Sequence, residues 1–157
     1  MNNVPKIVSL AMAGFVVALI ACRSASAPPV ALAADPCSAP ETQSKASQAA
    51  SLVGQQKFAE AEGPAKEALA ACPGHAQAAQ ALGAALVAQK KYDEAISRLE
   101  AVVAAKGDVA YAYYWLGHAY YNKKQTDKMT RNFDKFLQLA PNSAEASTVK
   151  QLLAGIR

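Results

Sequence analysis

The stretch 111-YAYYWLGHAYY-121 contains five tyrosines and a tryptophan, in a chain where alanine is far more common than aromatic residues. In a helix, residues three and four positions apart share a face. One such stripe consists of Tyr113, Leu116, Gly117 and Tyr120. A second stripe, on nearly the opposite side, consists of Tyr111, Tyr114, His118 and Tyr121. A surface helix normally has one apolar face, so this helix is either buried all round or has a core face and a contact face.

Length, composition and charge favour a single all-α domain. A chain of 157 residues suits one domain, and its abundance of alanine over β-branched and aromatic residues favours helix. The net charge is +4, but no run of like charge is longer than two residues. Without a clustered basic stripe we expect no nucleic-acid partner.

The N-terminus predicts an export signal that is not part of the fold. Lys6 is followed by an apolar run over residues 7–21. Fifteen residues are short for a membrane-spanning helix, which needs about 20, and they fit the apolar region of a secretory signal peptide. We therefore expect the mature protein outside the cytoplasm.

Two cleavage sites remain open for this signal peptide. The stretch 19-LIAC-22 ends the apolar run and resembles the bacterial lipobox, in which Cys22 becomes the lipidated first residue. The stretch 31-ALA-33 is an A-x-A site for simple secretion, but it lies far beyond the run. The lipobox predicts a signal over residues 1–21 and a periplasmic protein anchored to a bacterial membrane. The small, Pro-containing residues 22–37 predict a flexible tether.

The rest of the chain repeats with a period of 34 residues. Leu82 and Gly83 align with Leu116 and Gly117, and Leu99 aligns with Phe133. The units cover residues 42–75, 76–109 and 110–143, and a fixed period of this kind is the signature of repeat architectures. Each unit has room for two helices, expected in the second and third units over 76–89, 92–105, 109–122 and 126–139. We predict an α-solenoid of three helix–turn–helix repeats.

A capping helix is predicted after the third unit, within residues 144–157. Asn142, with Glu145 three residues later, has the spacing of a capping box that starts a helix. Val149, Leu152, Leu153 and Ile156 would then cover the last repeat.

The units resemble tetratricopeptide repeats. The matching residues of unit three are Tyr113, Leu116, Gly117, Tyr120, Phe133 and Pro141. Those of unit two are Leu82, Gly83 and Ala95, whereas unit one matches less well. Phe136 is larger than the alanine usual in the family, so we expect it to pack against the capping helix.

The resemblance implies a protein–protein interaction module without a catalytic role or a cofactor. In this family the first helix of each pair lines a concave groove. The groove positions of units two and three include Gln77, Gln80, Tyr111, Tyr114, His118 and Tyr121. A peptide or partner protein would contact these residues. The alternative is that the rings pack on the capping helix or on each other.

One variety of the family binds a C-terminal carboxylate through Lys and Asn. The matching positions here are Ala46 and Ala50, so that activity is not carried over.

The cysteines and a nearby histidine allow a second hypothesis. Cys37, Cys72 and His75 are the residues of a possible periplasmic redox or metal-binding factor, although no CxxC motif is present. The structural alternative is a disulfide between Cys37 and Cys72. These residues lie at neighbouring ends of an antiparallel helix pair, and an oxidising compartment preserves such a bond.

Overall fold

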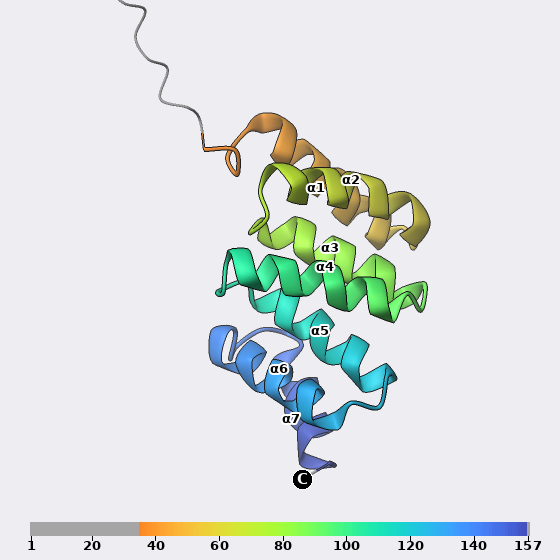
Figure 1. Cartoon of the computed structure of the whole chain (residues 1–157), viewed down its shortest axis with the longest axis vertical. Helices are drawn as coiled ribbons and strands as arrows, with labels where there is room; N and C mark the ends of the chain where they lie inside the picture. Colours follow the sequence, from red (N-terminus) through yellow and green to blue (C-terminus); the bar gives the residue numbers. More distant parts are fainter. Residues whose placement is uncertain (1–34, 157) are drawn as a thin grey trace, which may run out of the picture. The chain divides into compact units, whose positions relative to one another are not determined.

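The computed structural model describes residues 35–156, so the predicted signal peptide, Cys22 and most of the tether lie outside the described residues. Seven helices make up this part of the chain (Figure 1). They are α1 (Pro40–Gly54), α2 (Phe58–Ala71), α3 (Ala76–Ala88), α4 (Tyr92–Ala105), α5 (Ala110–Asn122), α6 (Thr126–Leu139) and α7 (Ala146–Ala154). The predicted all-α fold class is confirmed. No helix within residues 35–156 is long and apolar enough to cross a membrane.

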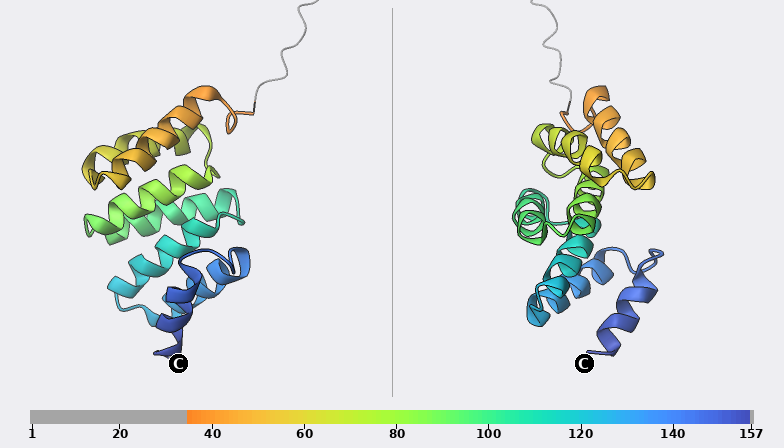
Figure 2. Two further views of the ribbon diagram at one scale, coloured as in Figure 1. Left: turned by 180° about the vertical axis from the view of Figure 1, so that it is seen from behind. Right: turned by 90° about the vertical axis from the view of Figure 1, so that its right-hand side faces the viewer.

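The helices form three antiparallel pairs, stacked in sequence order (Figure 1). α1 packs against α2 and α5 against α6, while α3 contacts both α1 and α5. Seen from the side, α2 and α4 lie in one layer, and α1 and α7 lie on the other side (Figure 2). The first helices of the pairs therefore form a continuous inner layer, which is the arrangement of an α-solenoid.

The turn inside each pair adopts the same backbone conformation. Gln56, Lys90 and Lys124, which are 34 residues apart, have φ of 60°, 60° and 59°. The next residue donates its N–H to a carbonyl five positions earlier, as from Lys57 to Leu52 at 2.9 Å. This left-handed C-terminal cap ends the helix and reverses the chain. The repeat is thus visible in the backbone as well as in the sequence.

Glycines allow close contacts in the second and third units. At Gly117, a Cβ would lie 2.4 Å from the Phe133 ring, so only glycine admits this phenylalanine between the helices of the third pair. At Gly83 the nearest atoms belong to Trp115 of the next unit, at 2.5 Å. Gly83 therefore serves the contact between α3 and α5.

The core becomes bulkier along the chain. Unit one contributes mainly small buried residues such as Ala49 and Ala65, whereas unit three contributes the fully buried rings of Phe133 and Phe136. Because burial of apolar area is the main stabilising term, unit one has the weakest core of the three.

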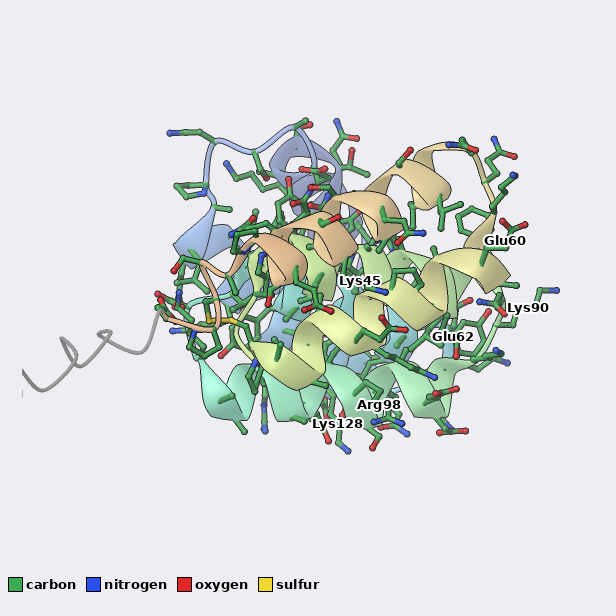
Figure 3. All side chains as sticks on the ribbon, turned by 90° about the horizontal axis from the view of Figure 1, so that it is seen from above. Lys45, Glu60, Glu62, Lys90, Arg98 and Lys128 are labelled. Carbon is green, nitrogen blue, oxygen red and sulfur yellow. A yellow bond between two sulfur atoms is a disulfide. The ribbon has the colours of Figure 1, made fainter. Side chains whose placement is uncertain are left out.

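A disulfide joins the two ends of unit one (Figure 3). It links Cys37, just before α1, to the buried Cys72 at the end of α2, and the two Cα atoms are 4.9 Å apart. Residues 35–38 form a turn in which the Ser38 N–H donates to the Asp35 carbonyl at 2.8 Å. The last residues of the predicted tether, which was expected to end at residue 37, therefore lie in this turn.

The capping helix starts later than the capping-box spacing indicates. α7 begins at Ala146, Glu145 occupies the N-cap position, and the side chain of Glu145 makes no capping hydrogen bond. The Glu145 carboxylate instead accepts a hydrogen bond from the Tyr111 hydroxyl at 3.1 Å. A tertiary contact thus replaces the local cap, and Asn142 lies outside the helix.

Candidate functional site

The candidate site is the solvent-facing side of α1, α3 and α5, which we call the first-helix face. On α5 the two stripes differ in burial. Leu116 and Tyr120 of the core stripe are buried, whereas Tyr113 of that stripe is half-buried, as are Tyr111, Tyr114 and His118 of the groove stripe. Tyr121 is 49% exposed and is, with Ile156, one of two exposed large apolar side chains in residues 35–156.

The half-buried rings form a cluster over the third unit. The Tyr114 ring lies 4.5 Å from the His118 ring and 5.0 Å from Trp115, measured between ring centroids. The Phe136 ring lies beneath it, 5.1 Å from Tyr114 and 6.0 Å from Tyr111. Phe136 thus contacts the groove-stripe tyrosines of its own unit, and it belongs to the same buried cluster as Val149 and Leu153 of the capping helix.

The hydroxyl groups of the core stripe are both bonded within the fold, whereas on the groove stripe only the Tyr111 hydroxyl is, to Glu145. Tyr120 Oη donates to Glu100 at 2.5 Å, and Tyr113 Oη donates to the Gly107 carbonyl at 3.1 Å. Burial and, after it, the bond to Glu100 raise the pKa of Tyr120 to about 12. The hydroxyls of Tyr114 and Tyr121 make no hydrogen bond to any described residue. Two phenols on the first-helix face are therefore available to a partner.

His118 lies inside the aromatic cluster and is uncharged at neutral pH. Its ring packs edge-on against Tyr114 and, at 5.3 Å, against Phe133. Burial lowers the pKa of His118 below its usual value, because removal from water disfavours the charged form. With these neighbours His118 contributes an aromatic ring with a polar edge to the first-helix face.

The unit-two end of the face is smooth and small. Gln77 is exposed and Gln80 half-buried, while Ala84 between them and α5 is only 7% exposed. Ala46 of α1, at a matching position, is fully buried. The face therefore changes from amide side chains over buried alanines at one end to aromatic rings at the other.

Trp115, which the helical phase leaves between the stripes, belongs to the contact between units. Its side chain lies against Gly83 of α3, and its Nε1 is buried without a hydrogen-bond partner in the described part of the chain.

Glu145 is a site residue that the sequence pattern did not select. It lies 34 residues after Tyr111, at the N-cap of α7, so it occupies the position after the third unit that corresponds to Tyr111. Extending the repeat offset into the capping helix would have identified it.

The residues of the redox or metal hypothesis have structural contacts. Cys37 and Cys72 are joined to each other, and His75 Nδ1 accepts a hydrogen bond from the Ala78 N–H at 3.3 Å at the start of α3. Among residues 35–156, no group of three or more His, Cys, Asp or Glu side chains is arranged to hold a metal ion.

A separate cleft of about 270 Å³ lies between α2 and α4, away from the first-helix face. Its walls include Leu69, Leu82 and Val102, with Lys66 and Arg98 at its edge. Both cations lie close to the Glu94 carboxylate, at 2.6 Å and 4.0 Å. Because Lys66 and Arg98 already have a partner in Glu94, the cleft has fewer groups available to bind a ligand than the aromatic face has.

The described chain is an α-solenoid of tetratricopeptide-like helix pairs. Residues 110–143, the same bounds as the third predicted unit, match the family model of the tetratricopeptide repeat. No curated protein sequence matches the chain.

Solved structures share the fold at low sequence identity. The first TPR domain of human RPAP3 has a TM-score of 0.62 at 22% identity, and the match covers 73% of this chain and 94% of that one. The first TPR of Spaghetti (RPAP3), solved with the HSP90 peptide SRMEEVD bound, has a TM-score of 0.61 with the same identity and coverage. MamA from Desulfovibrio magneticus RS-1 has a TM-score of 0.54 at 26% identity, and the match covers 73% of each chain.

Proposed function

We propose that this protein is an exported, non-catalytic interaction module that binds a peptide or a segment of a partner protein on its first-helix face. The observation that carries the proposal is that two groove-stripe tyrosines have hydroxyls that are not bonded within the fold, whereas the third, Tyr111, donates to Glu145. The hydroxyls of Tyr113 and Tyr120 are bonded within the fold, whereas those of Tyr114 and Tyr121 are not. Tyrosine combines a large apolar body with a polar tip, and it is enriched where interfaces gain most of their binding energy.

The solved relatives support this use of the fold. A structural neighbour, the first TPR of Spaghetti, was solved with a peptide bound, which supports a peptide as the ligand of this fold. The proposal requires no cofactor and no nucleic acid.

Sequence features support a location outside the cytoplasm. The apolar run at residues 7–21, followed by 19-LIAC-22, suits a lipid anchor on Cys22. The disulfide between Cys37 and Cys72 suits an oxidising compartment such as the periplasm. We therefore propose a periplasmic protein held at a bacterial membrane.

The function is tested by removing hydroxyls in matched pairs. Crosslinking and capture from envelope extracts compare the wild type with the double variant Tyr114→Phe/Tyr121→Phe. The control is Tyr113→Phe/Tyr120→Phe, which also removes two hydroxyls from α5 but on the core side. We expect the first variant to lose captured partner and the control, kept below its melting temperature, to retain it. Equal capture by the wild type and the first variant would refute the proposal.

The anchor is tested separately. We expect Cys22→Ser to release the protein into the soluble fraction or to block its processing. A mature N-terminus at Ala34 with no lipid mass on the wild-type protein would show that the A-x-A site is used and that Cys22 is removed.

A further inference from the structure

The first-helix face carries no basic side chain at its groove positions. These positions, in units one to three, are Gln43, Ala46, Ala50, Val53, Gln77, Gln80, Ala84, Val87, Tyr111, Tyr114, His118 and Tyr121. Lys124 lines a hollow with Tyr121 at the end of α5, but no groove position beside Tyr111 and Tyr114 has a basic side chain. An acidic segment bound there would lose water without meeting a cation, and burying an unpaired charge is costly. The composition of the face therefore disfavours acidic partners.

One carboxylate lies at the aromatic end of this face. Glu145 is half-buried and accepts a hydrogen bond from Tyr111 Oη at 3.1 Å. Within residues 35–156 it makes no ion pair, whereas Glu62, Glu67 and Glu94 all lie within 2.8 Å of a lysine. Its negative charge reaches both neighbouring phenols: burial raises the pKa of Tyr111 and of Tyr114, and Glu145 raises each further.

Tyrosine rings beside a carboxylate suit a cation. A Lys or Arg side chain above a tyrosine ring is attracted by the electron-rich face of the ring, and the attraction grows as water is excluded. The same helix shows such a contact on its other side, where Lys128 lies 5.1 Å from the centre of the Tyr120 ring.

We propose that the segment bound on the first-helix face presents a lysine or arginine side chain, which lies against Tyr111 and Tyr114 with its charge at Glu145. This inference rests on the proposed function and adds the chemistry of the partner. Glu145 selects the partner by charge, the aromatic cluster contacts the stem of the basic side chain, and the side chains of Gln77 and Gln80 accommodate uncharged residues of the same segment.

The probe is a phage-displayed library of random dodecapeptides, selected on the purified protein. We expect the enriched peptides to contain more Lys and Arg and less Asp and Glu than the input library. The affinity of the best peptide is then measured by calorimetry against the wild type, Glu145→Gln and Tyr114→Ala. The control is Glu41→Gln, which also removes a carboxylate at the start of a helix but away from this face.

We expect Glu145→Gln to weaken binding roughly fivefold to tenfold. Replacing the basic residue of the peptide by norleucine should have a similar effect, and combining the two changes should add little more. Glu41→Gln should leave the affinity unchanged. Melting temperatures of all variants separate loss of binding from loss of fold.

Two results overturn the inference in different ways. If enriched peptides are acidic, or if Glu145→Gln binds as the wild type does while Tyr114→Ala binds more weakly, the face binds peptides but does not select a cation. If no peptide is enriched, or if Tyr114→Ala has no effect on binding, the proposed function of this face is itself wrong.

Discussion

At the scale of single residues, the tyrosines of α5 differ in what their hydroxyl groups contact. Tyr120 is 4% exposed and its hydroxyl is bonded to Glu100, whereas the Tyr114 ring is half-buried and its hydroxyl has no bond to a described residue. The ring of Tyr114 nevertheless touches Phe136 and His118, so truncating it to alanine would disturb packing as well as any binding. Phenylalanine is therefore the more informative replacement.

We predict that Tyr120→Phe and Tyr114→Phe differ in stability. Tyr120→Phe removes a hydrogen bond to a charged group and should lower the free energy of unfolding by about 1 kcal/mol or more. Tyr114→Phe keeps the ring and breaks no bond within the fold, so its effect should stay within about 0.5 kcal/mol. Urea unfolding of both variants measures this difference. Equal losses would mean that the two stripes are equivalent parts of one core.

At the scale of helices and turns, each of the three pairs has the same chain reversal, in which a residue other than glycine adopts positive φ. This conformation is strained for residues with a side chain, and glycine adopts it without that strain. Gln56 is exposed, and its backbone N–H donates to the Val53 carbonyl at 2.9 Å, so the turn itself does not depend on the side chain.

We predict that Gln56→Gly stabilises the protein by about 0.5–1 kcal/mol. Glycine relieves the strain of the left-handed conformation, which stabilises the folded state. Its greater conformational freedom in the unfolded chain offsets part of this gain. Gln55→Gly is the control, because Gln55 has φ of −85° and should only lose stability when replaced. Thermal unfolding of the two variants measures the contrast, and a gain from Gln55→Gly would contradict this explanation.

Between the first two units, a charge cluster joins the helices (Figure 3). The Glu62 carboxylate of α2 lies 2.5 Å from Lys66 and 2.8 Å from Lys91, and Gln89 donates to it at 3.2 Å. The bonds from Lys66 and Lys91 lower the pKa of Glu62 to about 2. Glu60 on the same helix is exposed, and its nearest cation, Lys57, lies 3.8 Å away.

We predict an acid-dependent loss of stability that depends on Glu62. Because the folded-state pKa is lower than the ordinary value of 4.5, the contribution of Glu62 is complete above pH 4.5 and disappears as the pH falls towards 2. Its size should be on the order of 2 kcal/mol after allowance for solvent screening. Urea unfolding is measured between about pH 6 and pH 2.5, a range chosen around the ordinary and folded-state pKa values of Glu62. The free energy of unfolding should change less with pH in Glu62→Gln than in the wild type. Glu60→Gln should keep the wild-type profile, and parallel profiles for all three proteins would contradict the assignment.

At the scale of the whole molecule, stability is uneven along the array. Repeat arrays are held by contacts between neighbours, and a terminal unit has only one neighbour. Unit one combines this position with an alanine core, and the disulfide closes it over a sequence separation of 35 residues. The crosslink therefore supports the part of the array with the least buried apolar area.

We predict that Cys37→Ala/Cys72→Ala lowers the free energy of unfolding by about 3–4 kcal/mol, because the crosslink restricts the unfolded chain. The loss should concentrate in α1 and α2, so hydrogen exchange should speed up there before it does in α5 and α6. Reduction of the wild type by dithiothreitol should have the same effect. Unchanged melting after complete reduction would show that the bond does not support unit one.

The repeat pattern was sufficient to predict the order of the elements. The 34-residue period and the helical spacing of apolar residues indicated three pairs and a cap, and α4 and α6 begin and end where they were expected. These features are local, since helix periodicity and the spacing of apolar residues follow from residues within one unit. The proximity of Cys37 and Cys72 also followed, because antiparallel helices bring those ends together.

The partners of individual side chains, within a unit and between units, were decided only by the tertiary structure. Trp115 lies on Gly83 rather than in either stripe, Phe136 lies beneath Tyr111 and Tyr114, and Glu145 binds Tyr111 instead of capping its own helix. Each contact depends on the spacing and rotation of helices from different parts of the chain and on which rotamers fill the space between them. A linear pattern specifies which face of a helix is apolar, but the partner of each side chain across that face is set by packing in three dimensions.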